Sequence, residues 1–171
     1  MKQVLLITIA VIFIQLNSKA QSDSTTLRHQ FKHAIGVTAG FTIGNGLSYR
    51  HNFNKFEIQG SFAPFKNKER SRYCVGLTFF YKLVESQNVD FFLYQGNQYI
   101  YRQMKEYDWN TNVNEPIESE SIESYINNGI GIGIRFIIFK RVSLDIMGGY
   151  ASYNNYSEIS FTGETGLHFM F

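Results

Sequence analysis

The sequence predicts an all-β protein, namely an eight-stranded antiparallel up-and-down transmembrane β-barrel preceded by a cleaved signal peptide. Three observations lead to this prediction. Apolar residues recur at every second position in eight successive segments, the connections between these segments alternate between short and long, and the chain has 16 Phe and 11 Tyr but only two Pro. A repeat of two residues is the period of a strand, and aromatic residues favour strands. No segment shows the apolar repeat of an amphipathic helix.

Residues 1–20 differ from the rest of the chain. Lys2 precedes an apolar run over residues 4–14, which is too short to span a membrane as a helix, and the small residues Ser18 and Ala20 stand where a signal peptidase requires them. We therefore expect cleavage after Ala20. The sequence then divides into a signal peptide (residues 1–20), a short periplasmic lead (residues 21–32) and a barrel (residues 33–171).

The predicted mature chain is electrically neutral. The full chain has 16 Lys and Arg against 14 Asp and Glu, and the predicted signal peptide removes two lysines and no acid. The basic excess therefore belongs to targeting and gives no support to nucleic-acid binding. The single cysteine, Cys74, is far from the predicted cleavage site, so we expect neither a lipid anchor nor an internal disulfide.

Each of the eight segments has one predominantly apolar face. In the first four segments this face consists of Ile35, Val37, Ala39, Phe41 and Ile43; Leu47, Tyr49, His51 and Phe53; Phe56, Ile58, Gly60 and Phe62; and Tyr73, Val75, Leu77, Phe79, Tyr81 and Leu83. In the last four it consists of Val89, Phe91 and Leu93, then Tyr99 and Tyr101; Ile130, Ile132, Ile134, Phe136 and Ile138; Val142, Leu144, Ile146 and Tyr150; and Ile159, Phe161, Leu167, Phe169 and Phe171. The fifth segment loses its apolar repeat around Gly96, which predicts a bulge or a strand that has already left the membrane.

Short and long connections alternate along the chain. The short set is residues 54–55, 85–88 and 139–141, and the opposite set is residues 44–46, 64–72, 103–124 and 154–155. This alternation is expected of an up-and-down barrel with short periplasmic turns and longer outer loops.

The polar face of the segments carries both glycines and charged residues. The glycines are Gly36, Gly40, Gly76, Gly129, Gly131, Gly133, Gly149 and Gly166, and the charged residues are Arg50, Glu57, Lys82, Asp90, Arg135, Asp145 and Glu164. Glycine weakens a solvated strand, whereas in a narrow lumen it makes room for long side chains from the opposite wall. We therefore predict a filled interior with a network of lumen salt bridges, because buried charges require partners. The alternatives are a solvated polar face and a soluble lipocalin-like barrel with its apolar face turned inward.

Aromatic residues should form bands at both membrane–water interfaces of such a barrel. The predicted band on the turn side is Phe53, Phe56, Tyr81, Phe136, Phe169 and Phe171. The predicted band on the loop side is Phe41, Phe62, Tyr73, Tyr125, Tyr150 and Tyr156.

The chain ends on Leu167, Phe169 and Phe171 at alternate positions. This ending resembles the assembly signal of outer-membrane β-barrel proteins, and residues 33–171 resemble the small outer-membrane barrel family that includes OmpA-like and OmpX-like domains. The resemblance implies insertion by the barrel assembly machinery, with Phe171 as the recognised end. Such barrels serve as anchors, adhesins, small channels and lipid-modifying enzymes, so the fold does not fix a function.

We predict no catalytic, cofactor-binding or metal-binding residue. A lipid hydrolase would need one of the four histidines, His29, His33, His51 and His168, beside a serine and an acid. His168 shares a strand face with Glu164, but the four-residue spacing separates them by about 13 Å, too far for an orienting contact. The glycines at 129, 131 and 133 lack the spacing of a phosphate-binding loop.

Two of the longer loops carry opposite charge. The second outer loop contains the basic residues Lys66, Lys68, Arg70 and Arg72, and the third contains Glu106, Asp108, Glu115, Glu118, Glu120 and Glu123 against Arg102 and Lys105. We hypothesise that the basic loop contacts lipopolysaccharide phosphates, and that the acidic loop folds over it or binds divalent cations that bridge lipids. The alternative is two solvated loops without this role.

The sequence thus predicts a monomeric, non-enzymatic barrel in the outer membrane of a Gram-negative cell envelope, with a structural or surface-interaction role through residues 103–124. The expected partners are outer-membrane lipid, lipopolysaccharide and the barrel assembly machinery, without a cofactor or nucleic acid. A narrow porin-like channel is one alternative, although eight strands leave an interior just wide enough for side chains. A lipid-modifying enzyme and a soluble lipocalin-like binder are the others.

Overall fold

The computed structural model describes residues 31–67, 70–110 and 115–171, with the backbone alone at 70, 105–110 and 115–119. The predicted signal peptide and most of the predicted lead lie outside the described residues. No helix in the described part of the chain is long and apolar enough to cross a membrane.

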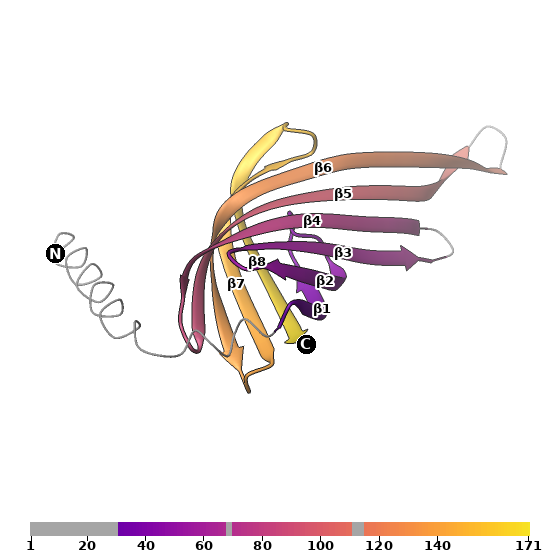
Figure 1. Cartoon of the computed structure of the whole chain (residues 1–171). Helices are drawn as coiled ribbons and strands as arrows, with labels where there is room; N and C mark the ends of the chain where they lie inside the picture. Colours follow the sequence, from indigo (N-terminus) through magenta and orange to yellow (C-terminus); the bar gives the residue numbers. More distant parts are fainter. Residues whose placement is uncertain (1–30, 68–69, 111–114) are drawn as a thin grey trace, which may run out of the picture.

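The described residues form eight antiparallel strands, which close into a barrel. The strands are β1 (His33–Ala39), β2 (Gly46–Phe53), β3 (Phe56–Lys66), β4 (Arg70–Glu85), β5 (Val89–Asn110), β6 (Glu115–Ile138), β7 (Val142–Tyr153) and β8 (Glu158–Met170). Each strand pairs with the next, and β1 pairs with β8 to complete the ring (Figure 1). The predicted fold class is confirmed.

The apolar faces of the strands point outward. Ile35 is 53% exposed and Leu47 is 70% exposed, whereas Arg50 on the opposite face is 3% exposed and Asp145 is fully buried. The inside of the barrel is therefore polar and charged, and the outside is an apolar band. This arrangement is the reverse of a lipocalin-like barrel, so that alternative was wrong.

The first strand is shorter than its sequence pattern suggests. The alternation of apolar and polar residues continues to Ile43, but β1 ends at Ala39 and the chain then turns into the mouth of the barrel. Ile43, predicted on the outer face, is fully buried. Gly44 and Gly46 have φ angles of 86° and 98°, which favour glycine and allow the chain to return to the wall at β2.

The fifth strand is regular where the sequence suggested a break. The pairing of β5 with β4 and β6 runs without interruption through Gly96, and the irregularity in this region lies on β4, between Lys82 and Val84. The outward positions around Gly96 are Gln95 and Asn97, which hydrogen-bond to each other (Nε2 to Oδ1, 2.8 Å). These two polar side chains bond to each other on the outer face, so they interrupted the apolar repeat although the strand continues. The predicted bulge at Gly96 was wrong.

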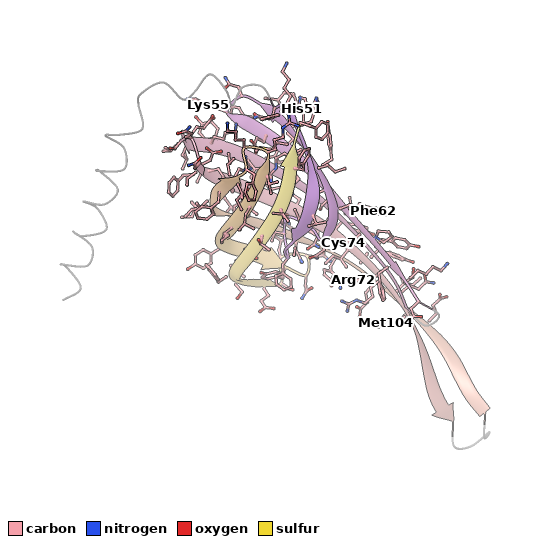
Figure 2. All side chains as sticks on the ribbon, turned by 90° about the horizontal axis from the view of Figure 1, so that it is seen from below. His51, Lys55, Phe62, Arg72, Cys74 and Met104 are labelled. Carbon is pink, nitrogen blue, oxygen red and sulfur yellow. The ribbon has the colours of Figure 1, made fainter. Side chains whose placement is uncertain are left out.

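Eleven of the twelve aromatic residues assigned to the two bands are exposed. Tyr125 is the exception, because it alternates in phase with the buried Asn127 and its hydroxyl accepts a hydrogen bond from Arg102 (3.3 Å) on the inner face. Its assignment to the outer band was wrong. Residues 103–124 were expected to form a loop. Residues 103–110 and 115–124 instead extend β5 and β6 as paired strands beyond the barrel (Figures 1 and 2), and the remaining four residues lie outside the described part of the chain.

The inward glycines leave space that other residues fill, which a pair of matched substitutions would test. A Cβ added at Gly131 would lie 2.7 Å from the Tyr94 ring and 2.8 Å from the Cα of Gly149, whereas one added at Gly163 would meet nothing within 4 Å. Gly131→Ala should lower the free energy of unfolding by about 1–3 kcal/mol through overpacking. Gly163→Ala should leave it unchanged or raise it slightly, because alanine suits a strand better than glycine. Urea titration of the barrel refolded in lipid vesicles measures both, and an equal effect of the two substitutions would contradict the prediction.

Candidate functional site

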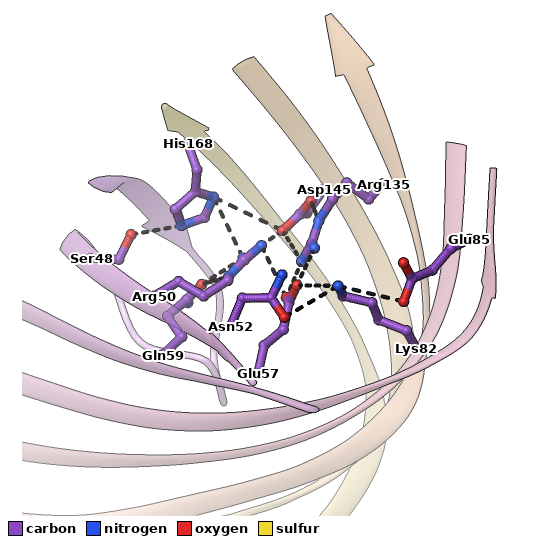
Figure 3. A network of polar contacts seen from close by, with 10 residues as sticks. All are labelled: Ser48, Arg50, Asn52, Glu57, Gln59, Lys82, Glu85, Arg135, Asp145 and His168. Atoms are coloured by element: carbon purple, nitrogen blue, oxygen red, sulfur yellow. Dashed lines mark hydrogen bonds and ion pairs between the residues drawn. The ribbon is translucent and has the colours of Figure 1, made fainter. Parts of the chain in front are cut away.

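A network of ion pairs occupies the turn end of the barrel interior (Figure 3). At its centre, Arg135 on β6 donates to both carboxylate oxygens of Glu57 on β3, each at 2.8 Å, and through Nε to Asp145 on β7, also at 2.8 Å. All three side chains are buried. All three guanidinium nitrogens of Arg135 thus donate to a carboxylate, and a buried ion pair is favourable only with such good geometry.

Arg50 and Lys82 extend this network to β2 and β4. Arg50 lies 2.5 Å from Asp145 and donates to the Oε1 of Gln59 at 2.6 Å. Lys82 lies 3.4 Å from Glu57 and 3.6 Å from Glu85. These ion pairs therefore bring three cations against three carboxylates.

The seven charged residues that the sequence placed in the lumen do not form one group. Five of them meet in the network, which consists of Arg50, Glu57, Lys82, Arg135 and Asp145. Asp90 is buried and pairs in register with Arg135 across β5 and β6. Glu164 is buried elsewhere, nearer the loop end.

Sequence reasoning missed Glu85, which it assigned to a turn, and the neutral members of the network, Asn52 and Gln59. The neutral residues share the alternation of Arg50 and Glu57, so their inward direction was readable. Their hydrogen-bond partners were not, because pairing across the lumen depends on the stagger of the strands.

An aromatic layer covers the network on the side toward the loops. Phe80, Phe92, Tyr94, Met147 and Ile43 form a buried apolar cluster. The guanidinium of Arg50 lies 4.6 Å from the centre of the Phe80 ring, and that of Arg135 lies 5.2 Å from the centre of the Phe92 ring. These cation–π contacts add attraction to charges that are already shielded from water.

The inward segment at residues 40–44 closes the loop end of the lumen. Glu164 on β8 holds it, because one carboxylate oxygen accepts from the hydroxyls of Thr42 and Thr162 and the other accepts from the backbone N–H of Ile43 (2.9 Å). A buried carboxylate with three hydrogen-bond donors is well satisfied without a cation. Glu164 thus anchors the plug and takes no part in the salt bridges.

His168 lies between a serine and an aspartate, an arrangement that resembles a hydrolytic triad. Its Nε2 is 2.9 Å from Ser48 Oγ, and its Nδ1 is 3.9 Å from Asp145 Oδ2. The second distance is too long for the orienting hydrogen bond of a triad, and Asp145 is already bound to two arginines. Because all three side chains are buried, a substrate carbonyl has no access to Ser48.

Buried side chains follow one another along the described interior, from the ion pairs through the aromatic layer to Thr42 and Ile43. A cavity of about 20 Å³ at the turn end, lined in part by Arg50, Asn52, Glu57, Arg135 and Ser143, has room for one water molecule. No group of three or more His, Cys, Asp or Glu in the described part of the chain is arranged to hold a metal ion.

The basic loop residues are divided between the two faces of the protruding sheet. Lys66 is exposed and follows the outward alternation of β3, whereas Arg72 continues the inward alternation of β4 and lies opposite Arg102 of β5. Lys68 and the side chain of Arg70 lie outside the described residues. In the acidic segment, Glu123 lies 3.8 Å from Arg102, and Glu120 accepts a hydrogen bond from Gln103. The side chains of Glu106, Asp108, Glu115 and Glu118 lie outside the described residues.

The three residues of the predicted assembly signal lie on the outer face of β8 and at its end. Leu167, Phe169 and Phe171 are about half exposed, and β1 pairs with residues 165–170 of this strand. They therefore present a row of apolar side chains next to the seam where the first and last strands meet.

Replacing Arg135 should destabilise the barrel far more than replacing Glu85. Arg135→Met leaves Glu57 and Asp145 buried with fewer partners, and removing one member of a buried ion pair costs roughly 3–5 kcal/mol. Glu85→Gln is the matched control, because the Glu85 side chain is 26% exposed and should contribute less than about 1 kcal/mol. The urea midpoint of the refolded barrel, followed by gel mobility, measures both, and losses of similar size would show that the network is not held by Arg135.

Comparison with known proteins supports the fold at low sequence identity. No protein-family model and no curated protein matches the chain. Its structure is similar to the N-terminal β-barrel domain of OprF from Pseudomonas aeruginosa, with 11% identity, a TM-score of 0.51, and coverage of 81% of this chain and 95% of that one. It is also similar to Neisserial surface protein A (NspA), with 16% identity, a TM-score of 0.50, and coverage of 81% and 93%. The chain therefore has the fold of the small eight-stranded outer-membrane barrels, as its resemblance to them implied.

Proposed function

We propose that this chain is an integral outer-membrane barrel of the Gram-negative cell envelope, that it has no enzymatic activity, and that it binds extended polypeptides through the free edge of the β5–β6 hairpin. The free edge is the observation that carries the proposal. It makes the surface-interaction role of residues 103–124 specific, because an unpaired strand edge is a template for another strand.

The edge begins where β6 leaves the barrel. Pairing between β6 and β7 starts at Asn128, and no strand in the described part of the chain pairs with that side of β6 over residues 115–125. Asn155, in the turn after β7, makes the last hydrogen bonds that continue the β6–β7 pairing. Its backbone N–H donates to Ile126 O (3.1 Å), and its Oδ1 accepts from the N–H of Ile126 (2.9 Å). Beyond Ile126, the edge extends for about 35 Å at the rise of a strand.

The hydrogen-bonding groups on this edge can be assigned. Successive residues of a strand direct their N–H and C=O groups to opposite sides. Since Ile126 directs its groups away from β5, so do Ser124, Ile122 and Glu120. These three residues offer a row of backbone donors and acceptors to an incoming strand.

The charge of the edge indicates which strand it accepts. Residues 115–125 include Glu115, Glu118, Glu120 and Glu123 and no basic residue. Two copies of such an edge repel each other, because like charges on adjacent strands are destabilising. A basic extended segment of another protein is therefore the partner that we propose, and the repulsion agrees with a monomeric barrel.

The outer surface supports membrane insertion. Apolar side chains surround the barrel, with exposed aromatic residues toward both ends, which is the pattern of a lipid-facing surface. Outer-membrane lipid is thus a proposed partner, with Lys66 facing outward toward lipopolysaccharide phosphates. The exposed row of Leu167, Phe169 and Phe171 is available to an assembly machinery.

The channel and lipid-modifying alternatives find less support. The ion pairs, the aromatic layer and the segment held by Glu164 succeed one another along the lumen, which leaves no described path for solutes. The buried serine, histidine and aspartate have no substrate access.

Membrane fractionation tests the proposed location. The full chain should be recovered in the outer membrane and should migrate differently on gels before and after heating, because a closed barrel resists detergent. Deleting Phe171 should reduce this recovery if Phe171 is the recognised end. Recovery of the full chain as a soluble periplasmic protein would contradict the proposal.

A proline at the free edge tests the proposed interaction. Ser124→Pro removes one edge N–H without breaking the β5–β6 ladder, and proline is tolerated on edge strands. Its affinity for a labelled synthetic peptide of alternating Lys and Val should fall roughly fivefold to tenfold, since a backbone hydrogen bond contributes about 1 kcal/mol and the ring obstructs its neighbours. Fluorescence anisotropy with the barrel in detergent micelles measures this affinity.

Ser124→Ala is the matched control, because it changes the same side chain and keeps the N–H, so it should bind as the unchanged chain does. Alternating Glu and Val should bind more weakly than the basic peptide. If a peptide with a methylated backbone bound as well as the unmodified one, the edge would not be the binding surface.

A further inference from the structure

Two histidines face each other on the outer surface at the turn end of the barrel. His33 on β1 and His51 on β2 are directly opposite in the register of the two strands, and both are partly exposed. Their Nδ1 atoms are 3.2 Å apart, and the hydroxyl of Tyr49 lies 2.6 Å from the Nδ1 of His33. Figure 2 shows His51 and Lys55 at the end of the barrel opposite the long hairpin.

Ordinary hydrogen bonds do not account for all three groups. A ring nitrogen of histidine has one position in the ring plane, which holds either a proton or a lone pair. The Nδ1 of His33 is within hydrogen-bond distance of both His51 and Tyr49, so it can satisfy only one of them in this plane. A cation placed between the two rings would satisfy both imidazoles at once.

The spacing of the two nitrogens matches that of a chelate. Zinc binds histidine nitrogens at about 2.0–2.1 Å in tetrahedral geometry, which places two such nitrogens about 3.3–3.4 Å apart. The observed 3.2 Å is within a small ring movement of this value. Neutral imidazole also suits copper and nickel.

We propose that His33 and His51 form a two-histidine binding site for a divalent transition-metal cation, represented by Zn²⁺. The two Nδ1 atoms are the protein ligands, and water molecules complete the coordination.

Aromatic rings flank the site on both sides. The ring of Phe171 stacks on His33 with a centre-to-centre distance of 5.8 Å, and the ring of Phe53 lies against His51 at 4.2 Å. These contacts restrict the rotation of the imidazoles, so less freedom is lost when a metal binds.

The site lies beside the seam of the barrel. His33 exchanges two backbone hydrogen bonds with Phe171, at 3.1 and 2.9 Å, next to the pairing of β1 with β8. A metal held between β1 and β2 would therefore fix the first strand at the point where the ring closes. An ion that binds the folded barrel and not the unfolded chain stabilises the barrel by mass action.

The test uses the refolded mature chain without a polyhistidine tag. All proteins carry His29→Gln, which removes the remaining histidine near this end of the sequence, and the variants add His33→Gln or His51→Gln. Because the two side chains are partly exposed, both variants should fold, and identical heat-dependent gel mobility in the presence of EDTA verifies this. Calorimetric titration with Zn²⁺ then measures affinity and stoichiometry.

We expect the reference protein to bind one Zn²⁺ and each added substitution to weaken binding about 100-fold, because it converts a chelate into a single ligand. Zn²⁺ should also raise the temperature at which the reference barrel loses its folded gel mobility, and it should not do so for the variants. Absence of saturable Zn²⁺ binding by the reference protein, or equal binding by the variants, would overturn the proposal and leave the histidines as a hydrogen-bonded pair.

Discussion

Arg135 joins opposite walls of the barrel, and the arrangement of the other strands depends on this contact. Its carboxylate partners, Glu57 and Asp145, lie on β3 and β7, which are four strands apart in a closed ring of eight. Three ions buried in one narrow space are unfavourable unless each has its partners in good geometry. A shift of two residues in any of these strands would keep its apolar face outward but would move its charge about 7 Å away from its partners. The ion pairs therefore select a single register from several that the apolar pattern alone would permit.

The rest of the interior is built around these charges. Phe80 and Phe92 cover the two guanidinium groups, and Gly131 and Gly133 of β6 provide the space that the rings of Tyr94 and Phe92 need. Above them, Glu164 holds the segment that contains Thr42 and Ile43 in the mouth of the barrel. Each layer excludes water from the one below it, which strengthens the electrostatic contacts of the network. The packing of the interior is thus in part a consequence of the charges.

The direction of most side chains could be predicted from the sequence, because alternation is a local property of a strand. The prediction failed where the backbone and the apolar pattern did not change together. Ile43 continued the apolar repeat of the first segment although the strand had ended at Ala39, and Gln95 and Asn97 interrupted the repeat of a strand that continues. Tyr125 was misplaced because its direction depends on its alternation with Asn127. The partners inside the lumen, such as Glu85 with Lys82 and Ser48 with His168, depend on the stagger of strands far apart in sequence, which no local pattern contains.

The two halves of β6 show how one strand meets opposite requirements. Within the barrel, its inward residues are glycines and Arg135, which suit a crowded lumen, and both of its edges are paired with β5 and β7. Beyond Ile126 the partner on one side is lost, and the sequence changes to glutamate and serine. Closing a barrel removes every edge within the membrane, where an unpaired backbone group would be costly. Outside the membrane, water can hydrogen-bond to an open edge, and the glutamates on this edge underlie the partner preference that we propose. The strand that helps to close the barrel is therefore also the one whose free edge we propose for binding, where β6 leaves the ring.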